Sequence, residues 1–167
     1  RCWIYMNLRS NLDILKISEG VVETIAYALK NGATIYTDTT MGLSGINKRI
    51  LDELGVGYKC LIADQETVDL AKDKGITRSM AAVEIAARDK KDKIFIFGNA
   101  PTALYKAIEM NSEGLLNASA IIGVPVGFVG AEDSKETDME YIVSRGRKGG
   151  SNLAAAIINA ILYYYFT

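Results

Sequence analysis

Hydrophobic residues along the chain recur with helical spacing in some segments and form short uninterrupted runs in others. Helical spacing begins after Ser18, a predicted N-cap residue, and stops at Asn31-Gly32. The other segments with helical spacing are 43–54, 66–74, 79–88, 101–110 and a long one that starts near Ser151. The short apolar runs between them predict strands at 33–37, 58–62, 93–97, 118–123 and 141–143.

This alternation of strands and helices predicts an α/β fold. Parallel strands need crossover helices, and strands without polar alternation are typical of a sheet that is covered on both faces. We therefore expect a three-layer α/β/α architecture with a mostly parallel central sheet. A length of 167 residues fits one domain, and no linker, repeat or low-complexity tract divides the chain, so we expect a single domain over residues 1–167.

The composition excludes several classes of partner. Nineteen basic and twenty acidic residues leave a net charge of -1, so no overall field attracts nucleic acid or a membrane surface. The longest apolar stretch, 153–166, is short for a membrane span and contains Asn159, and no signal-peptide pattern opens the chain. We expect a soluble, cytoplasmic protein. The sequence begins at Arg1 and not at Met, which is compatible with an upstream segment that was removed or left out.

The absence of histidine from this sequence excludes more chemistry than any other count. It removes Ser-His-Asp and Cys-His catalysis as well as histidine-ligated zinc. The two cysteines, Cys2 and Cys60, form no CxxC pattern, and we interpret them as reduced thiols. Asp38 has no second acidic residue in its loop, so we expect no metal site there and interpret Asp38 as part of an Asx-type turn.

Polar and glycine-rich segments follow the predicted strands. In open α/β sheets, ligands bind beyond the carboxyl ends of the strands, where the chain leads into helices. Most of the segments at these positions collect hydroxyls, amides or glycines: 37–42, 63–65, 98–102, 123–130 and 144–151. This concentration predicts a binding site at one edge of the sheet.

The last of these segments points to an anionic ligand. Arg145, Arg147 and Lys148 lie among glycines immediately before the helix that starts near Ser151. Glycines let a ligand approach the backbone, and a helix start offers unpaired N–H groups, so carboxylates or phosphates are the expected guests. The spacing of a P-loop is missing, because Gly149 follows the lysine. The alternative is a solvated basic turn without a ligand.

Other positions allow two interpretations. Asn99 or Ala100 is either an N-cap residue, with Pro101 in the first helical turn, or a ligand contact. Arg78 is either a surface cation or a further anchor for an acidic ligand. Phe128, in a loop rich in glycine and proline, is expected to form an apolar wall. An unrelated phosphate-ester enzyme with the same glycine-rich edge remains a further alternative.

Taken together, these segments resemble the precorrin-8X methylmutase family, also called cobalt-precorrin-8 methylmutase, of cobalamin biosynthesis. The resemblance covers nearly all of the chain after the first helix. The segments that carry it are Gly32–Thr39, Met41, Ser44–Arg49, Thr77–Ser79, Gly98–Leu104, Ile122–Ala131, Ser134–Glu136 and Ser144–Asn152.

The resemblance implies an isomerase that moves a methyl group between neighbouring carbons of a corrin precursor, giving the hydrogenobyrinic or cobyrinic acid skeleton. It also implies that no redox cofactor is used, that the protein is a homodimer, and that the ligand is a macrocycle bearing many carboxylates. The residues that we expect to bind this substrate are Thr37, Thr39, Met41, Arg78, Asn99, Thr102, Phe128, Ser144, Arg145, Arg147, Lys148, Gly149 and Ser151.

One feature of the family is missing from this sequence. The resemblance implies a histidine general acid ahead of the first helix, at the place of Ile4 or Tyr5, and no histidine stands there. Tyr5 is the candidate that remains, although a phenol with a pKa near 10 is a poorer acid at neutral pH than an imidazolium. The alternative function is therefore a corrinoid-binding protein that has kept the carboxylate site and lost the acid.

Overall fold

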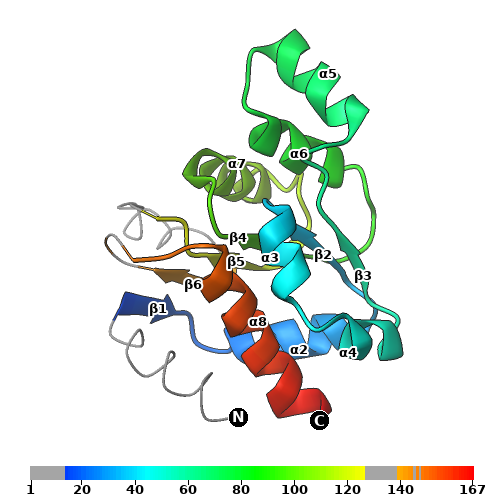
Figure 1. The fold of residues 1–167 in the computed structure, drawn as a ribbon, viewed down its shortest axis with the longest axis vertical. Helices are drawn as coiled ribbons and strands as arrows, with labels where there is room; N and C mark the ends of the chain where they lie inside the picture. Colours follow the sequence, from blue (N-terminus) through cyan, green and yellow to red (C-terminus); the bar gives the residue numbers. More distant parts are fainter. Residues whose placement is uncertain (1–13, 127–138, 145, 147) are drawn as a thin grey trace.

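A six-stranded, mostly parallel sheet lies at the centre of the molecule (Figure 1). The computed structural model describes residues 14–126, 139–144, 146 and 148–167. Its strand order is β1-β6-β5-β4-β2-β3, and β1 pairs antiparallel with β6 whereas the other pairs are parallel. The strands are β1 (Leu15–Ile17), β2 (Thr34–Thr37), β3 (Gly57–Lys59), β4 (Lys93–Phe97), β5 (Ala118–Gly123) and β6 (Glu140–Ser144).

Helices cover both faces of the sheet, which confirms the expected α/β/α layering (Figure 1). On one face lie α2 (Val21–Lys30), α3 (Thr40–Gly45), α4 (Lys48–Glu53) and α8 (Ser151–Phe166). On the other lie α6 (Arg78–Ala86) and α7 (Pro101–Ser112), and α5 (Gln65–Lys74) packs on α6 farther from the sheet (Figure 1). None of the helices in the described part of the chain is long and apolar enough to cross a membrane.

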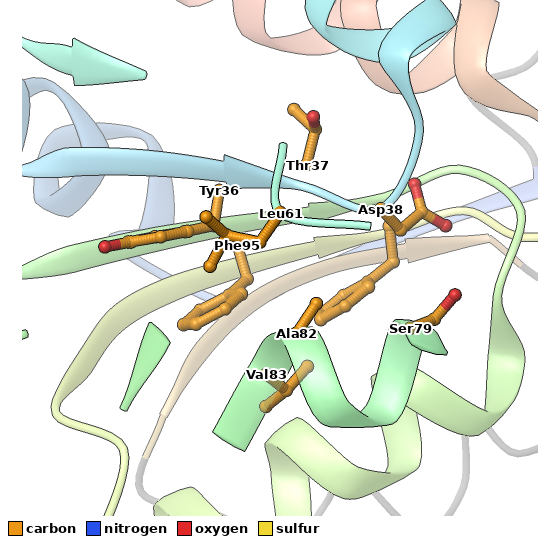
Figure 2. A pocket seen from close by; sticks show the side chains of 9 residues that line it. Tyr36, Thr37, Asp38, Leu61, Ser79, Ala82, Val83 and Phe95 are labelled. Carbon is orange, nitrogen blue, oxygen red and sulfur yellow. The ribbon is translucent and has the colours of Figure 1, made fainter. Parts of the chain in front are cut away.

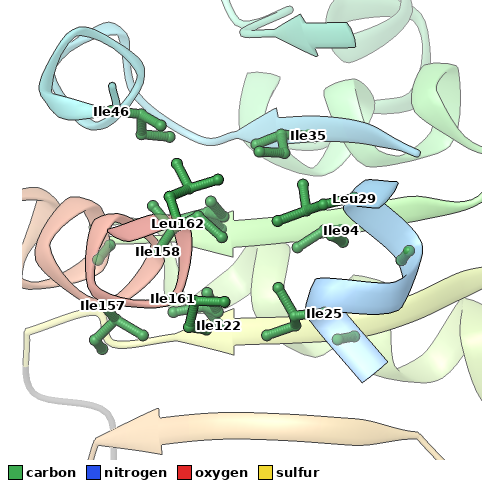
Figure 3. Close-up of a cluster of buried hydrophobic side chains, with 14 of the residues drawn as sticks. Ile25, Leu29, Ile35, Ile46, Ile94, Ile122, Ile157, Ile158, Ile161 and Leu162 are labelled. Carbon is green, nitrogen blue, oxygen red and sulfur yellow. The ribbon is translucent and has the colours of Figure 1, made fainter. Parts of the chain in front are cut away.

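Alternate residues of the central strands fill two separate cores, because successive side chains of a strand point to opposite faces. Toward α2 and α8 the strands present isoleucines, and these pack among Ile25, Leu29 and Ile158 (Figure 3). Toward α6 and α7 they present aromatic rings. The rings of Tyr36 and Phe95 stack at 5.4 Å, and those of Phe95 and Phe97 at 5.7 Å.

Three local expectations were wrong. Gly20, with φ +87°, is the N-cap residue of α2, because the Ser18 side chain instead bonds to Glu140 and to the backbone N–H of Tyr141. The helix expected over 43–54 is two short helices, since Ile46 is extended and Asn47 starts α4 by accepting a hydrogen bond from the N–H of Ile50. The expected strand over 58–62 is the shorter β3, and β1 was not anticipated.

A leucine pair near α7 tests the packing of the second core. Leu104 is fully buried against Gly123, whereas Leu115 is 58% exposed. Leu104→Ala is expected to lower the free energy of unfolding by about 2–5 kcal/mol, because it leaves a cavity. Leu115→Ala, the control, is expected to change it by about 0.5 kcal/mol or less. Urea denaturation of both variants measures the difference, and equal losses would contradict this description of the core.

Candidate active site

Strands β2 and β4 end beside the amino ends of three helices. The loop after β2 leads into α3, the loop after β4 leads into α7, and α8 begins against both loops. Thr39, the N-cap residue of α3, accepts a hydrogen bond from the N–H of Gly42, and its Oγ1 also lies 2.8 Å from Oγ of Ser151 in α8. Segments more than 100 residues apart in sequence therefore meet at this edge, which we call the helix-start edge.

Gly98 lies directly against the start of α8. A Cβ atom at this position would lie 2.5 Å from Cα and 2.7 Å from the backbone nitrogen of Ser151. Real Cβ atoms essentially never come that close to backbone, so a side chain here would force the β4 loop and α8 apart. Gly98 is thus needed for the close approach of these two segments.

Asp38 holds the β4 loop from the neighbouring strand. Its side chain is buried, and its carboxylate accepts backbone hydrogen bonds from Gly98 at 2.9 Å and from Asn99 and Ala100 at 2.7 Å each. The expectation of an Asx-type turn was wrong: the carboxylate binds the turn that leads from β4 into α7, 60 residues away in sequence. Of the two candidate N-cap residues of α7, Asn99 and Ala100, the structure has Ala100 in that position.

Glycines form the approach to α8. Gly150, its N-cap residue, has φ +123° and no side chain, and its N–H is bonded to the carbonyl of Val124 at 2.7 Å. A Cβ at Gly149 would lie 2.3 Å from that same carbonyl oxygen, so glycine is required there too. Within the described residues, no side chain accepts a hydrogen bond from the N–H groups of the first turn of α8. These donors and the exposed Lys148 favour an anion.

A small depression lies beside Asp38, between the sheet and α6 (Figure 2). The aromatic core residues Tyr36, Phe95 and Phe97 line its floor, and Ser79 of α6 lies on its wall. Arg78, the residue before Ser79, is exposed at the first turn of α6. The depression therefore lies between the first turn of α6 and the residues at the end of β2.

Tyr36 is not suited to replace a histidine acid. It is almost completely buried, and its hydroxyl donates a hydrogen bond to Oδ2 of Asp89 at 3.0 Å. Burial first, and then the hydrogen bond to Asp89 and its negative charge, raise the pKa of this phenol well above its usual value. Tyr36 therefore holds its proton too tightly for general acid catalysis near neutral pH.

The expected substrate-binding residues fall into three groups. Near the edge and at least partly accessible are Thr39, Met41, Arg78, Asn99, Thr102, Lys148, Gly149 and Ser151. Two others are buried: the Thr37 hydroxyl already donates to the carbonyl of Thr39 at 3.0 Å, and Ser144 lies at the end of β6, its Oγ without a partner among the described residues. Phe128, Arg145, Arg147 and the candidate acid Tyr5 lie outside the described residues.

Sequence reasoning missed the two residues that shape the edge. Asp38 and Gly98 each follow directly after a predicted strand, and this position is the signal that points to them. Their roles depend on contacts across strands, with Asp38 bound to the β4 loop and Gly98 packed on α8. Neither contact is visible in local sequence patterns.

The residues of the helix-start edge lie within a match to a known protein family. The family model described as precorrin-8X methylmutase (CbiC) matches residues 8–164. The chain belongs to this family. The precorrin-8X methylmutase match spans the whole helix-start edge, from Thr39 to Ser151.

Individual relatives agree with this assignment. The cobalt-precorrin-8 methylmutase of Salmonella typhimurium is 52% identical over 158 residues, which are 92% of this chain and 73% of that protein. That of Methanothermobacter thermautotrophicus is 40% identical and covers 89% of this chain and 70% of its own. A solved structure titled precorrin-8X methylmutase related protein has a TM-score of 0.81 at 34% identity and covers 91% of this chain and 82% of its own.

Replacing Gly98 tests the close contact between the β4 loop and α8. Gly98→Ala is expected to lower the free energy of unfolding by about 2 kcal/mol or more, because the new methyl group overlaps backbone atoms of Ser151. The control is Gly114→Ala, at φ +71° with open space around it, which is expected to cost about 1 kcal/mol from backbone strain alone. If thermal denaturation ranks Gly114→Ala as the more damaging, the described contact is wrong.

Proposed function

We propose that this chain is an isomerase of cobalamin biosynthesis that moves a methyl group within precorrin-8X or its cobalt form, giving hydrogenobyrinic or cobyrinic acid. The observation that carries this proposal is the match to the precorrin-8X methylmutase family over residues 8–164. The Salmonella and Methanothermobacter relatives are both named for cobalt-precorrin-8, which makes the cobalt form the first substrate to assay.

The helix-start edge suits a macrocycle that carries many carboxylates. The N–H groups of the first turn of α8 and the ammonium group of Lys148 would bind carboxylates, and Arg145 and Arg147 precede them in sequence. Thr39 and Asn99 would supply neutral hydrogen bonds from the two neighbouring loops. Met41, which is 65% exposed at the start of α3, would contact the apolar ring.

The reaction needs few groups from the protein. One bond between carbon and the methyl group breaks, another forms on the neighbouring carbon, and any proton that the macrocycle takes up is matched by one that it releases. Substrate and product therefore have the same atoms, and cobalt, where present, arrives with the substrate. The chain must hold the ring in place and manage one proton, for which the family resemblance implies a histidine that this sequence does not contain.

An assay of methyl migration tests this function. The purified chain is incubated with cobalt-precorrin-8 and, separately, with precorrin-8X, and absorbance spectra and mass spectrometry follow the reaction. We expect a change of spectrum at constant mass, faster than in the protein-free control. Tight binding of the coloured product without turnover would instead favour the corrinoid-binding alternative. If the chain shows neither binding nor turnover, both the isomerase function and the corrinoid-binding function are contradicted.

Removing a positive charge tests the proposed carboxylate anchor. Lys148→Ala is expected to raise the Kd for hydrogenobyrinic acid by about fivefold, because an exposed ion pair contributes at most about 1 kcal/mol. The control, Lys72→Ala, removes an exposed lysine from α5 and is expected to leave the Kd unchanged. Absorbance titration at low and high salt measures both, and equal affinities for the two variants would remove Lys148 from the site.

We also propose that the protein acts as a homodimer in the cytoplasm. Helices α2 and α8 are the candidate contact surface. Tyr27 of α2 is 71% exposed and Tyr164 of α8 is 81% exposed, and the two helices are in contact with each other. Exposed aromatic side chains are enriched at protein interfaces.

Light scattering tests the dimer. The unaltered chain is expected to have twice the 18.2 kDa mass of one chain, and Tyr164→Asp is expected to weaken dimerisation by about tenfold or more by placing a charge in the contact. Tyr105→Asp, on α7 at the opposite face, is the control and should remain dimeric. A monomeric unaltered chain would contradict the homodimer, whereas a dimeric Tyr164→Asp variant would contradict only its location.

A further inference from the structure

We propose that Asp38 is a positioning residue for the substrate, a role that rests on the proposed function. Its carboxylate holds the turn formed by Gly98, Asn99 and Ala100 and thereby keeps Asn99 in place for the ligand. Asp38 does not itself touch the substrate.

The geometry for this role is complete in the structure. The side chain of Asp38 is 6% exposed, and both carboxylate oxygens are used: Oδ1 by the N–H of Gly98, Oδ2 by those of Asn99 and Ala100. Three backbone donors that converge on one carboxylate leave the turn little freedom to rotate. The backbone of Asn99 is therefore held at 2.7 Å by a buried group while the residue itself is exposed at the helix-start edge.

Asp38 acts on the approach to α7. Of its three backbone partners, Ala100 is the N-cap residue of α7, and Gly98 and Asn99 precede it. The carboxylate therefore fixes the path of the chain from β4 into the helix, and Asn99 lies in the middle of that path.

The same turn connects Asp38 to α8. Gly98 donates to Asp38 and also packs against the backbone of Ser151, so a rotation of the turn would move the surface on which α8 begins. A carboxylate that served stability alone would affect binding only in proportion to the folded fraction. A positioning carboxylate affects binding through Asn99, and this difference can be measured.

A double-mutant cycle measures whether Asp38 affects ligand binding through Asn99. Titrations of hydrogenobyrinic acid are made with Asp38→Asn, Asn99→Ala and the combined variant, with each Kd corrected for the folded fraction. We expect each single substitution to raise the Kd by about tenfold, and the combined variant to raise it by about tenfold as well rather than about a hundredfold, because both remove the same contact. Additive losses would overturn the proposal.

Asp89→Asn is the matched control. Asp89 also accepts a backbone hydrogen bond, from Lys91 at 3.0 Å, and a side-chain hydrogen bond from Tyr36. Asp89→Asn is expected to leave the corrected Kd unchanged. Equal corrected values for Asp38→Asn and Asp89→Asn would overturn the role of Asp38 while leaving the proposed function intact. Failure of the unaltered chain to bind hydrogenobyrinic acid would contradict the proposed function itself.

Hydrogen exchange on the unaltered chain gives a second measurement that does not depend on the folding of a variant. The amides of Gly98, Asn99 and Ala100 are expected to be protected already without ligand and to gain less than about twofold protection from hydrogenobyrinic acid. A large gain at these three amides would show that the turn becomes ordered only when the ligand binds, and would overturn the positioning role of Asp38.

Discussion

Parallel strands impose the constraint on which the rest of this structure depends. Because β2, β4, β5 and β6 run in the same direction, their carboxyl ends lie at the same edge of the sheet, and the chain must leave that edge several times. The helices that begin there bring unsatisfied N–H groups together, and buried backbone donors must find acceptors. Thr39 satisfies one such donor of α3, and Asp38 satisfies three in the turn that leads into α7.

Close packing at the edge depends on residues without side chains. Gly98 lets the β4 loop contact the backbone of Ser151, and Gly149 lets the approach to α8 contact the Val124 carbonyl. Further along the same helix, a Cβ at Gly45 would lie 2.9 Å from Cβ of Ala155, so α3 and α8 are also in close contact. The side chain of Asn159 then fixes the two helices by accepting from the N–H of Asn47 and donating to the carbonyl of Gly45, each at 2.8 Å. The position of α8 is therefore determined along most of its length.

Sequence patterns predicted the elements whose conformation depends on neighbouring residues in the chain. The strands Lys93–Phe97 and Ala118–Gly123 were predicted with their observed bounds, because uninterrupted apolar runs between turn residues have few other stable conformations. The role of Ser18 was predicted wrongly, because its hydroxyl bonds to Glu140, 122 residues away in sequence. Asp38 was misassigned for the same reason. The position of a loop after a strand predicted which loops lie at the same edge of the sheet. It did not predict that the side chain of Thr37 is buried and donates its hydroxyl to the carbonyl of Thr39.

In the proposed function, binding and proton transfer depend on different parts of this chain. The helix-start edge includes Asp38, Thr39, Gly98 and Ser151, whereas the family resemblance implies that the acid precedes the first helix, in a stretch outside the described residues. Among the described residues, the contacts at the edge are made by backbone groups, hydroxyls and the carboxylate of Asp38. Hydrogen bonds to the ligand periphery do not require a proton donor at the ring, so loss of the acid would leave the proposed carboxylate contacts in place. Under this proposal, affinity for the product tests the edge and turnover tests the proton donor, and the two measurements together separate a binding site from a complete enzyme.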